Sequence, residues 1–186
     1  LPANTNFTVD SSGKLEGVVI YVAKIGSNRY TSLGAAFAAV PNNGAATIEI
    51  MDDIELTAMI DIAGSGKNIT LTDDGNGPHT ISRAASFTTA RMILVRVGNT
   101  LTLEGSGGND AEPDIIIDGN NVAITTGTAQ QAIAVGASTG NWNATMYLNP
   151  GVKLQNHNVS SNDGAAVIVY GTLYMNGGTI TDSKGK

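Results

Sequence analysis

The 186-residue chain has no cysteine, which excludes disulfides, thiolate zinc sites and thiol catalysis. It also carries little charge. Only 14% of its residues are charged, and 10 basic residues against 16 acidic ones give a formal net charge of −6. The attraction to phosphate that supplies most non-specific nucleic-acid affinity is therefore missing. We expect no nucleic-acid partner.

Long apolar runs are absent as well. The longest stretches cover residues 17–23, 91–97 and 165–170. Each is far shorter than the roughly 20 residues that cross a bilayer. No charged and then apolar leader opens the chain, so we expect any export signal to have been removed. The sequence predicts no membrane insertion.

Glycine, threonine and asparagine are abundant and make up about a third of the chain, and these types favour turns and β-edges over helix. Hydrophobic residues account for 41% of the sequence, which is enough to build one packed core. The composition therefore predicts a single all-β domain.

A short strand pattern recurs along the chain, with two apolar residues on either side of one outward residue. The outward residues of its five copies are Glu49, Thr70, Thr102, Tyr147 and Tyr174. A second strand pattern follows each copy. A third follows the first four copies and ends at Gly64, Gly98, Gly136 and Gly171. Strands this short cannot bury their apolar faces within one unit, but stacked units share a continuous core.

We therefore predict a right-handed parallel β-helix over residues 47–186, with about five coils and three strands per coil. The spacing between first strands is irregular. The surplus residues, at 84–90, 106–113, 120–130 and 138–144, are expected to form loops outside the solenoid. The fifth coil has no third strand before Lys186, so we expect the chain to be a fragment of a longer solenoid.

The first 46 residues have a different pattern. Residues 1–16 form a polar lead-in, and residues 17–46 contain an expected strand at 17–23, a two-residue turn at Gly26-Ser27 and a short helix. Thr31 or Ser32 is the expected N-cap of that helix. Its apolar residues recur at helical spacing, and we expect them to cover the open end of the first coil.

Two segments resemble a known superfamily. Residues 29–48, RYTSLGAAFAAVPNNGAATI, resemble the opening of pectate-lyase-like right-handed parallel β-helix proteins, in which a helix precedes the first coil. Residues 171–181, GTLYMNGGTIT, are similar to the repeat of bacterial cell-surface, adhesin-like β-helix proteins. The resemblance implies a secreted or cell-surface bacterial location.

The resemblance leaves activity open, because this superfamily includes polysaccharide lyases, glycoside hydrolases, esterases and non-catalytic surface proteins. Three signatures of its enzymes are missing from the sequence: Gly-His-Gly, Asn-x-Asp with a separate Asp-Asp, and Arg-x-Lys. We therefore expect a non-catalytic module, either a stalk or an adhesin-like unit that binds glycans or a host surface protein. The alternative is a carbohydrate-active enzyme that uses carboxylates in its turns.

The candidate binding residues are aromatic or lie on the outward row. Tyr147 and Tyr174 come from adjacent coils and offer faces on which sugar rings could stack. Glu49 is expected on the same row, and Trp142 lies in a polar loop. The alternatives are that the tyrosines stack only on each other and that Trp142 covers apolar surface.

Two aspartate pairs, Asp52-Asp53 and Asp73-Asp74, follow the first strand in consecutive coils. If they stack, their carboxylates suit Ca²⁺ or paired acid–base chemistry. The alternative is that each aspartate caps backbone N–H groups in its own turn. His79 and His157 have no Ser or Asp at a spacing that suggests a triad, and no other cofactor is implied.

The last coil is expected to be open. Leu173, Met175 and Ile180 begin a coil that the sequence does not complete. Unpaired strand edges and apolar side chains favour pairing with another copy. We therefore expect either end-to-end self-association through residues 171–181 or higher mobility there than in residues 93–103.

Overall fold

The computed structural model of the protein describes residues 5–124, 131–136, 143–159 and 166–185. Within these ranges it is mostly β, as the sequence predicts, with parallel sheets and one helix. No helix in this part of the chain is long and apolar enough to cross a membrane.

The largest sheet has seven strands in the order β19-β15-β11-β8-β5-β3-β4. Five of them run parallel: β5 (Ala45–Ile50), β8 (Asn68–Asp73), β11 (Thr100–Leu103), β15 (Thr145–Leu148) and β19 (Thr172–Met175). At one end, β3 (Ala23–Ile25) and β4 (Asn28–Tyr30) continue the sheet in antiparallel pairing.

Two further sheets are entirely parallel. The five-stranded sheet contains β6 (Ile54–Leu56), β9 (His79–Arg83), β12 (Ile115–Asp118), β16 (Val152–Gln155) and β20 (Thr179–Thr181). The four-stranded sheet contains β7 (Ile60–Ile62), β10 (Ile93–Val95), β14 (Ile133–Val135) and β18 (Val167–Val169). A small parallel pair is formed by β13 (Ala123–Ile124) and β17 (Asn158–Val159).

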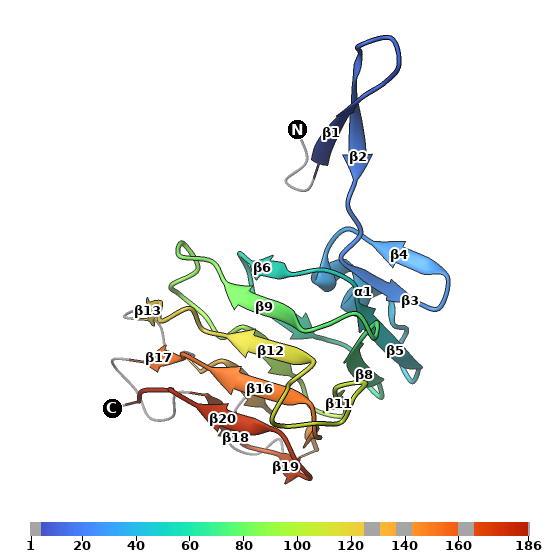
Figure 1. The fold of residues 1–186 in the computed structure, drawn as a ribbon. Coiled ribbons are helices and arrows are strands. Elements are labelled where there is room, and N and C mark those ends of the chain that lie inside the picture. Colours follow the sequence, from blue (N-terminus) through green and yellow to red (C-terminus); the bar gives the residue numbers. More distant parts are fainter. Residues whose placement is uncertain (1–4, 125–130, 137–142, 160–165, 186) are drawn as a thin grey trace.

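The chain passes through these sheets in a fixed order (Figure 1). One passage, termed a circuit, adds a strand to the seven-stranded sheet, then to the five-stranded sheet and then to the four-stranded sheet. The circuits are β5-β6-β7, β8-β9-β10, β11-β12-β14, β15-β16-β18 and β19-β20. Strands β13 and β17 are additions to the third and fourth circuits that the sequence did not predict.

Alternate side chains of these strands face one interior. The predicted inward rows are confirmed for Ile69, Leu71, Leu101, Leu103, Met146 and Leu148, which are register partners in consecutive circuits and are all fully buried. Period-2 alternation explains this arrangement, since residues i and i+2 of a strand lie on one face of its sheet.

Strand β5 differs from the expected register. The sequence pattern aligned Ile48 with Ile69, but in the structure Ile48 pairs with Leu71, and Ala46 pairs with Ile69. The difference is two residues. Such a shift keeps every inward residue inward, so apolar alternation alone cannot distinguish the two registers.

The predicted N-terminal cap is present. Helix α1 (Leu33–Ala39) begins at Ser32, whose side chain accepts a hydrogen bond from the Ala35 N–H at 3.2 Å. The buried face of the helix, with Phe37 at its centre, belongs to the same core as the strands and packs against β3, β4, β5 and β7. The predicted turn at Gly26-Ser27 connects β3 and β4.

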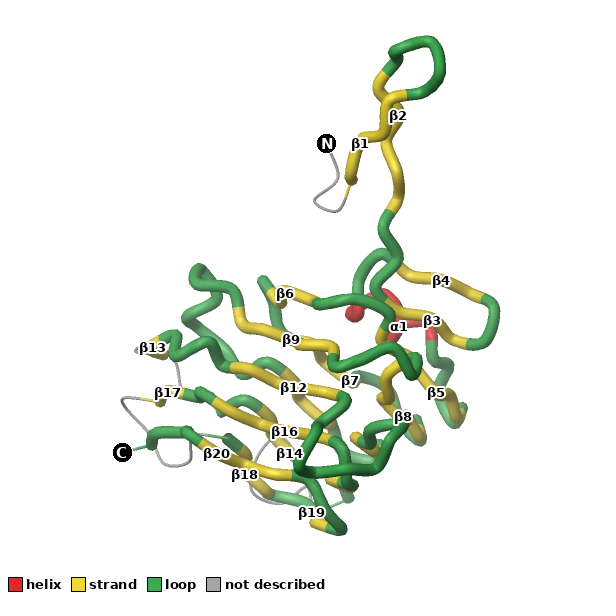
Figure 2. Tube along the Cα trace, in the orientation of Figure 1, coloured by secondary structure: helices red, strands yellow, loops and turns green. Residues whose placement is uncertain are grey.

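The expected strand over residues 17–23 is interrupted, and the polar lead-in contains a strand that was not predicted. Strand β2 (Leu15–Val19) ends before β3 begins, and it pairs antiparallel with β1 (Thr5–Val9). Asp10 explains the hairpin, because its carboxylate accepts hydrogen bonds from the backbone N–H groups of Ser12 and Lys14. Figure 2 shows this hairpin standing away from the three sheets.

The last circuit is more open than the others. Met175 is 55% exposed and Ile180 is 38% exposed, whereas their counterparts Leu148 and Leu154 in the preceding circuit are fully buried. The predicted inward row therefore loses its cover at β19 and β20.

The shared interior yields a stability prediction. Leu103→Ala removes a fully buried side chain between two other buried residues of its row. We expect it to lower the free energy of unfolding by about 2 to 5 kcal/mol. Urea denaturation measures the loss. Thr47→Ala, at an exposed position of β5, is the control and should change stability by less than about 1 kcal/mol. Equal effects of the two variants would contradict the shared core.

Candidate functional site

Two tyrosines form the most distinctive feature of the outward face of the seven-stranded sheet. Tyr147 of β15 and Tyr174 of β19 are register partners. Their ring centroids lie 4.8 Å apart with an interplanar angle of 11°, so the rings stack face to face. This places them side by side, as the sequence predicted.

The stack determines which aromatic surface remains available. One face of each ring is occupied by the other ring, and the row continues on the far side of Tyr147 with Thr102. Strand β19 is at the end of the sheet, and Tyr174 is 47% exposed. The free aromatic surface is therefore the outer face of Tyr174.

A row of polar side chains runs beside the tyrosines and was not identified from the sequence. The Asn149 Nδ2 donates to Glu104 Oε2 at 3.1 Å, and the Asn176 Nδ2 donates to Asn149 Oδ1 at 2.9 Å. Each asparagine lies two residues after one of the tyrosines and therefore on the same side of its strand. The repeated Tyr-x-Asn spacing was the signal available in the sequence.

Glu49 does not belong to the tyrosine row, which corrects the sequence prediction. Because β5 is shifted by two residues, Glu49 pairs in register with Thr72, and the tyrosine row ends at Thr47. The Glu49 carboxylate instead forms an ion pair with Lys24 Nζ at 2.9 Å. Trp142, the remaining candidate binding residue, lies outside the described residues.

The four turn aspartates do not gather into one site. Asp73 is buried and accepts hydrogen bonds from both the N–H and the Oγ of Ser106. Asp52 accepts from the N–H of Asp53, and Asp53 accepts from the N–H of Thr80. Each carboxylate thus binds its own turn or the neighbouring circuit.

The register shift of β5 is the reason why the aspartate pairs do not stack. It places Asp73 opposite Ile50 rather than opposite Asp52. Within the described ranges, no group of three or more His, Asp or Glu side chains is arranged to hold a metal ion. Asp52 and Asp73 are therefore not register partners, and the Ca²⁺ site stays a prediction.

Asp74 pairs with His79, which begins β9. Its Oδ1 lies 3.0 Å from His79 Nε2. Burial alone would raise the pKa of Asp74, but hydrogen bonds from His79 and Asn76 outweigh it and lower the pKa to about 2. Asp74 therefore stays ionised far below neutral pH, which does not suit a general acid.

Two polar side chains, Arg83 and His157, are buried inside the core. Arg83 is 1% exposed and donates from Nη1 to the carbonyls of Phe87 and Ala90, and its guanidinium lies 4.6 Å from the centroid of the Phe87 ring. His157 is 3% exposed, and its Nε2 has no hydrogen-bond partner among the described residues. Burial and then the charge of Arg83 lower the pKa of His157 to about 4.

Gly119 provides the space for this histidine. A Cβ at position 119 would lie 2.6 Å from the Nδ1 of His157 and 2.5 Å from the Asn156 carbonyl oxygen. Any larger residue would therefore displace the imidazole. The group has no ionised nucleophile, and its polar atoms are enclosed, so we assign it to the structure of the core and not to a catalytic site.

Comparisons of this chain with protein-family models, with curated protein sequences and with experimentally determined structures give no match.

The buried histidine predicts a pH dependence of stability. The pKa of His157 is about 4 in the folded protein, against about 6.5 in the unfolded chain. Between these values the unfolded state binds more protons. Stability should therefore fall as the pH decreases from 6.5 to 4, by on the order of 3 kcal/mol for this group. The stabilisation from the lowered pKa of Asp74 stays constant over this range, because it is lost only as the pH falls below about 3.8.

Urea denaturation at pH 7 and at pH 4.5 tests this expectation. His157→Gln is the variant, and the decrease in its free energy of unfolding between the two pH values should be smaller than in the unchanged chain. An identical decrease in both proteins would show that His157 does not titrate as its surroundings require.

Proposed function

We propose that the chain is a right-handed parallel β-helix module of a secreted or cell-surface bacterial protein, and that it binds glycans without cleaving them. The stacked tyrosines on its exposed sheet face are the observation that carries the proposal. The binding unit is the outer face of Tyr174, together with the polar row that ends at Asn176.

The solenoid part of the proposal is supported by the repeated order of the circuits. Each strand of a circuit pairs in parallel with the corresponding strand of the next circuit, in all three sheets. Right-handed connection between parallel strands is the strong general preference, and we adopt it for these circuits.

The binding part is supported by the chemistry of the exposed face. A sugar ring offers an apolar C–H face and hydroxyl groups at its edge, and tyrosine has an apolar ring and a polar tip. Asn149 and Asn176 supply amide groups beside the rings. Tyr147 positions Tyr174 by stacking against its inner face.

The non-catalytic part is supported by what the turn carboxylates contact. Asp53 and Asp73 accept hydrogen bonds from backbone N–H groups, and Asp74 is held by His79 and Asn76. These contacts fix the turns and stabilise the ionised carboxylates. The resemblance of residues 29–48 and 171–181 to surface β-helix proteins agrees with the proposed location.

A glycan array followed by titration of the retained glycan tests the proposal. Tyr174→Ala should weaken binding roughly tenfold, since it removes an aromatic contact worth about 1 kcal/mol or slightly more. Tyr21→Ala is the matched control, because Tyr21 is also exposed but lies in the N-terminal segment. Unchanged binding by the Tyr174 variant, or release of cleaved product from uronate polymers, would contradict the proposal.

We also propose that the 186-residue chain associates with a second copy through the end formed by β18, β19 and β20. All three strands are at the end of their sheets, so each presents unpaired backbone groups. Residues 166–181 contain no charged side chain, and charge is the usual protection of such an edge. Val169, Met175 and Ile180 add exposed apolar surface there.

Light scattering over a concentration series tests the association. Met175→Lys places a charge on the exposed edge and should shift the chain towards monomer. Ala38→Lys, on the exposed face of α1, carries the same charge change and should leave association unaltered. A chain that is monomeric at every concentration would refute this interface. Because Tyr174 lies at the same edge, glycan titrations belong at concentrations below the onset of association.

A further inference from the structure

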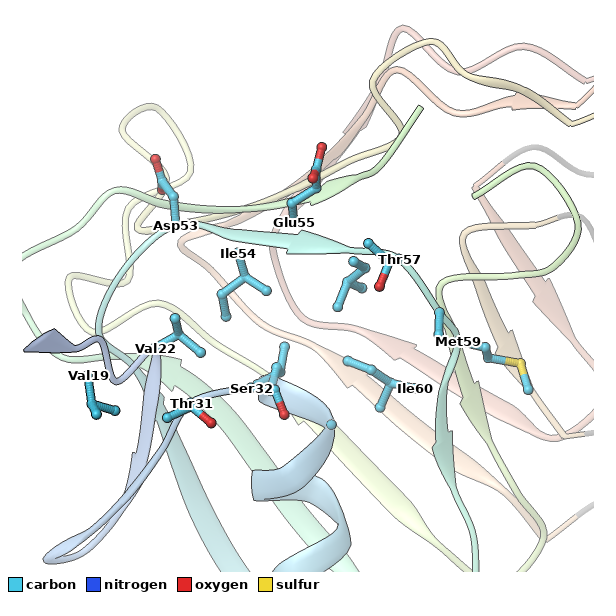
Figure 3. Close-up of a pocket in the computed structure, with 14 residues that line it drawn as sticks. Val19, Val22, Thr31, Ser32, Asp53, Ile54, Glu55, Thr57, Met59 and Ile60 are labelled. Atoms are coloured by element: carbon cyan, nitrogen blue, oxygen red, sulfur yellow. The ribbon is translucent and has the colours of Figure 1, made fainter. Parts of the chain in front are cut away.

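A groove of about 750 Å³ lies at the other end of the molecule, between β6 and the start of helix α1 (Figure 3). Its floor is made of core residues, including Ile54 and Leu56 of β6, Ile60 of β7 and Leu33 of α1. The helix packs against β3, β4, β5 and β7 but leaves the side of β6 uncovered. The N-terminal cap is therefore incomplete along β6.

The edge of β6 that borders the groove has backbone groups that could pair with another strand. In the five-stranded sheet, β6 is the terminal strand and pairs with β9. The Ala84 N–H donates to the Leu56 carbonyl at 3.0 Å, so the backbone groups of Leu56 face β9. Successive residues of a strand alternate in direction, and the N–H and C=O of Glu55 therefore face the open edge.

The neighbouring strand β2 has a matching free edge. Within the described residues β2 pairs with β1 alone. The Asp10 N–H donates to the Lys14 carbonyl at 2.9 Å. This is the first hydrogen bond between the two strands, and it shows that the backbone groups of Lys14 point towards β1. By alternation Val18 also faces β1, whereas the backbone groups of Gly17 and Val19 face away from it. Val18 is 41% exposed and Val19 is 52% exposed.

The connection to β3 already leads towards β6. The Met51 N–H donates to the Val22 carbonyl at 2.9 Å, which extends the antiparallel pairing of β3 with β5 beyond both strands. Val22 is buried, and Ile20 is partly buried against the core, so Val18 is the next residue on that side of the chain. Val19, at the end of β2, lines the groove.

We propose that β2 docks antiparallel on the free edge of β6, with Val19 opposite Glu55, and closes the groove. Two independent constraints select this register. It brings the outward-facing backbone groups of β2 and β6 together. It also places Ile20 opposite Ile54 and Val18 opposite Leu56, so that two apolar side chains enter the groove. The alternative with Gly17 opposite Glu55 satisfies the backbone but places position 16, a glutamate, opposite the buried Leu56.

The occupant is the hairpin of the same chain. Only residues 20–22 separate β2 from β3, so the hairpin is tethered beside the groove at a high effective concentration. Docking also completes the cap, because it covers the side of β6 that α1 leaves open. If the pairing of Val22 with Met51 continued unchanged along the chain, it would differ from the proposed register by one residue. One extra residue in the corner between β5 and β6 accommodates this difference, as in a β-bulge.

Engineered disulfides test the register in the full chain, which has no cysteine of its own. Val19→Cys with Glu55→Cys joins two exposed positions that become a directly opposed pair, with Cα atoms about 5.5 Å apart and within disulfide range. We expect an oxidised monomer. Val19→Cys with Thr57→Cys is the matched control, because Thr57 lines the same groove but lies two residues out of register.

The outcomes separate the possibilities. An oxidised monomer in the Glu55 pair, with markedly lower yield in the Thr57 pair, supports the docked register. Equal yields overturn it, and a disulfide-linked dimer shows that the hairpin reaches a second copy instead. Both double variants are compared by melting temperature in the reduced state, so that a folding defect is recognised.

Hydrogen exchange provides a second test without any disulfide. In the unaltered chain, docking protects the Glu55 amide, which otherwise points into solvent. Val18→Ser should increase its exchange rate at least several-fold by removing the side chain that enters the groove. Val19→Ser should not, because the proposed register turns the Val19 side chain outward beside Glu55. A Glu55 amide that exchanges in the unaltered chain as fast as an exposed loop amide refutes the docking.

Discussion

The structure depends on one constraint: strands of consecutive circuits stack in parallel register, so residues at equivalent positions must pack on each other about 4.8 Å apart. Inside, this requires side chains that tolerate close contact with their own kind, and the row of Leu71, Leu103 and Leu148 satisfies it. In the part of the chain that the structure describes, no layer of helices covers the faces of the sheets. Every strand must therefore place its apolar residues on the same side, and loops can vary only between strands.

The same constraint creates the outward features. When two tyrosines occupy equivalent positions they stack, and when two asparagines do so they form a hydrogen-bonded row. The surface that we propose to bind glycans is thus a consequence of register and not of a specially shaped loop. Polar side chains in the interior need space and hydrogen-bond partners. Gly119 has no side chain and so leaves room for the His157 ring, and the nearby Arg83 donates hydrogen bonds to backbone carbonyls of its own loop.

The sequence predicted much of this arrangement, and its errors have a common origin. Apolar alternation located the strands, the inward rows and the adjacent tyrosines, because burial on one face is what alternation records. It did not detect the shift of β5, since moving a strand by two residues leaves the apolar pattern unchanged. That single ambiguity misplaced Glu49 and aligned the aspartate pairs. The β1–β2 hairpin was missed because its turn depends on the Asp10 carboxylate, and the polar composition masked it.

The two ends of the stack face the same physical problem, since each exposes strand edges and the ends of apolar rows. At the first circuit, β3 and β4 extend the seven-stranded sheet and α1 packs against β7, whereas β6 is a terminal strand beside the groove. At the last circuit, β18, β19 and β20 are all terminal strands and carry no charged residue. The first end can be closed by a strand already attached to it. The last end offers no such strand within the described residues, which is why we propose the contact between copies there. This asymmetry favours pairing of two copies through their last circuits over a continuous head-to-tail filament, because the capped end cannot present a full set of edges.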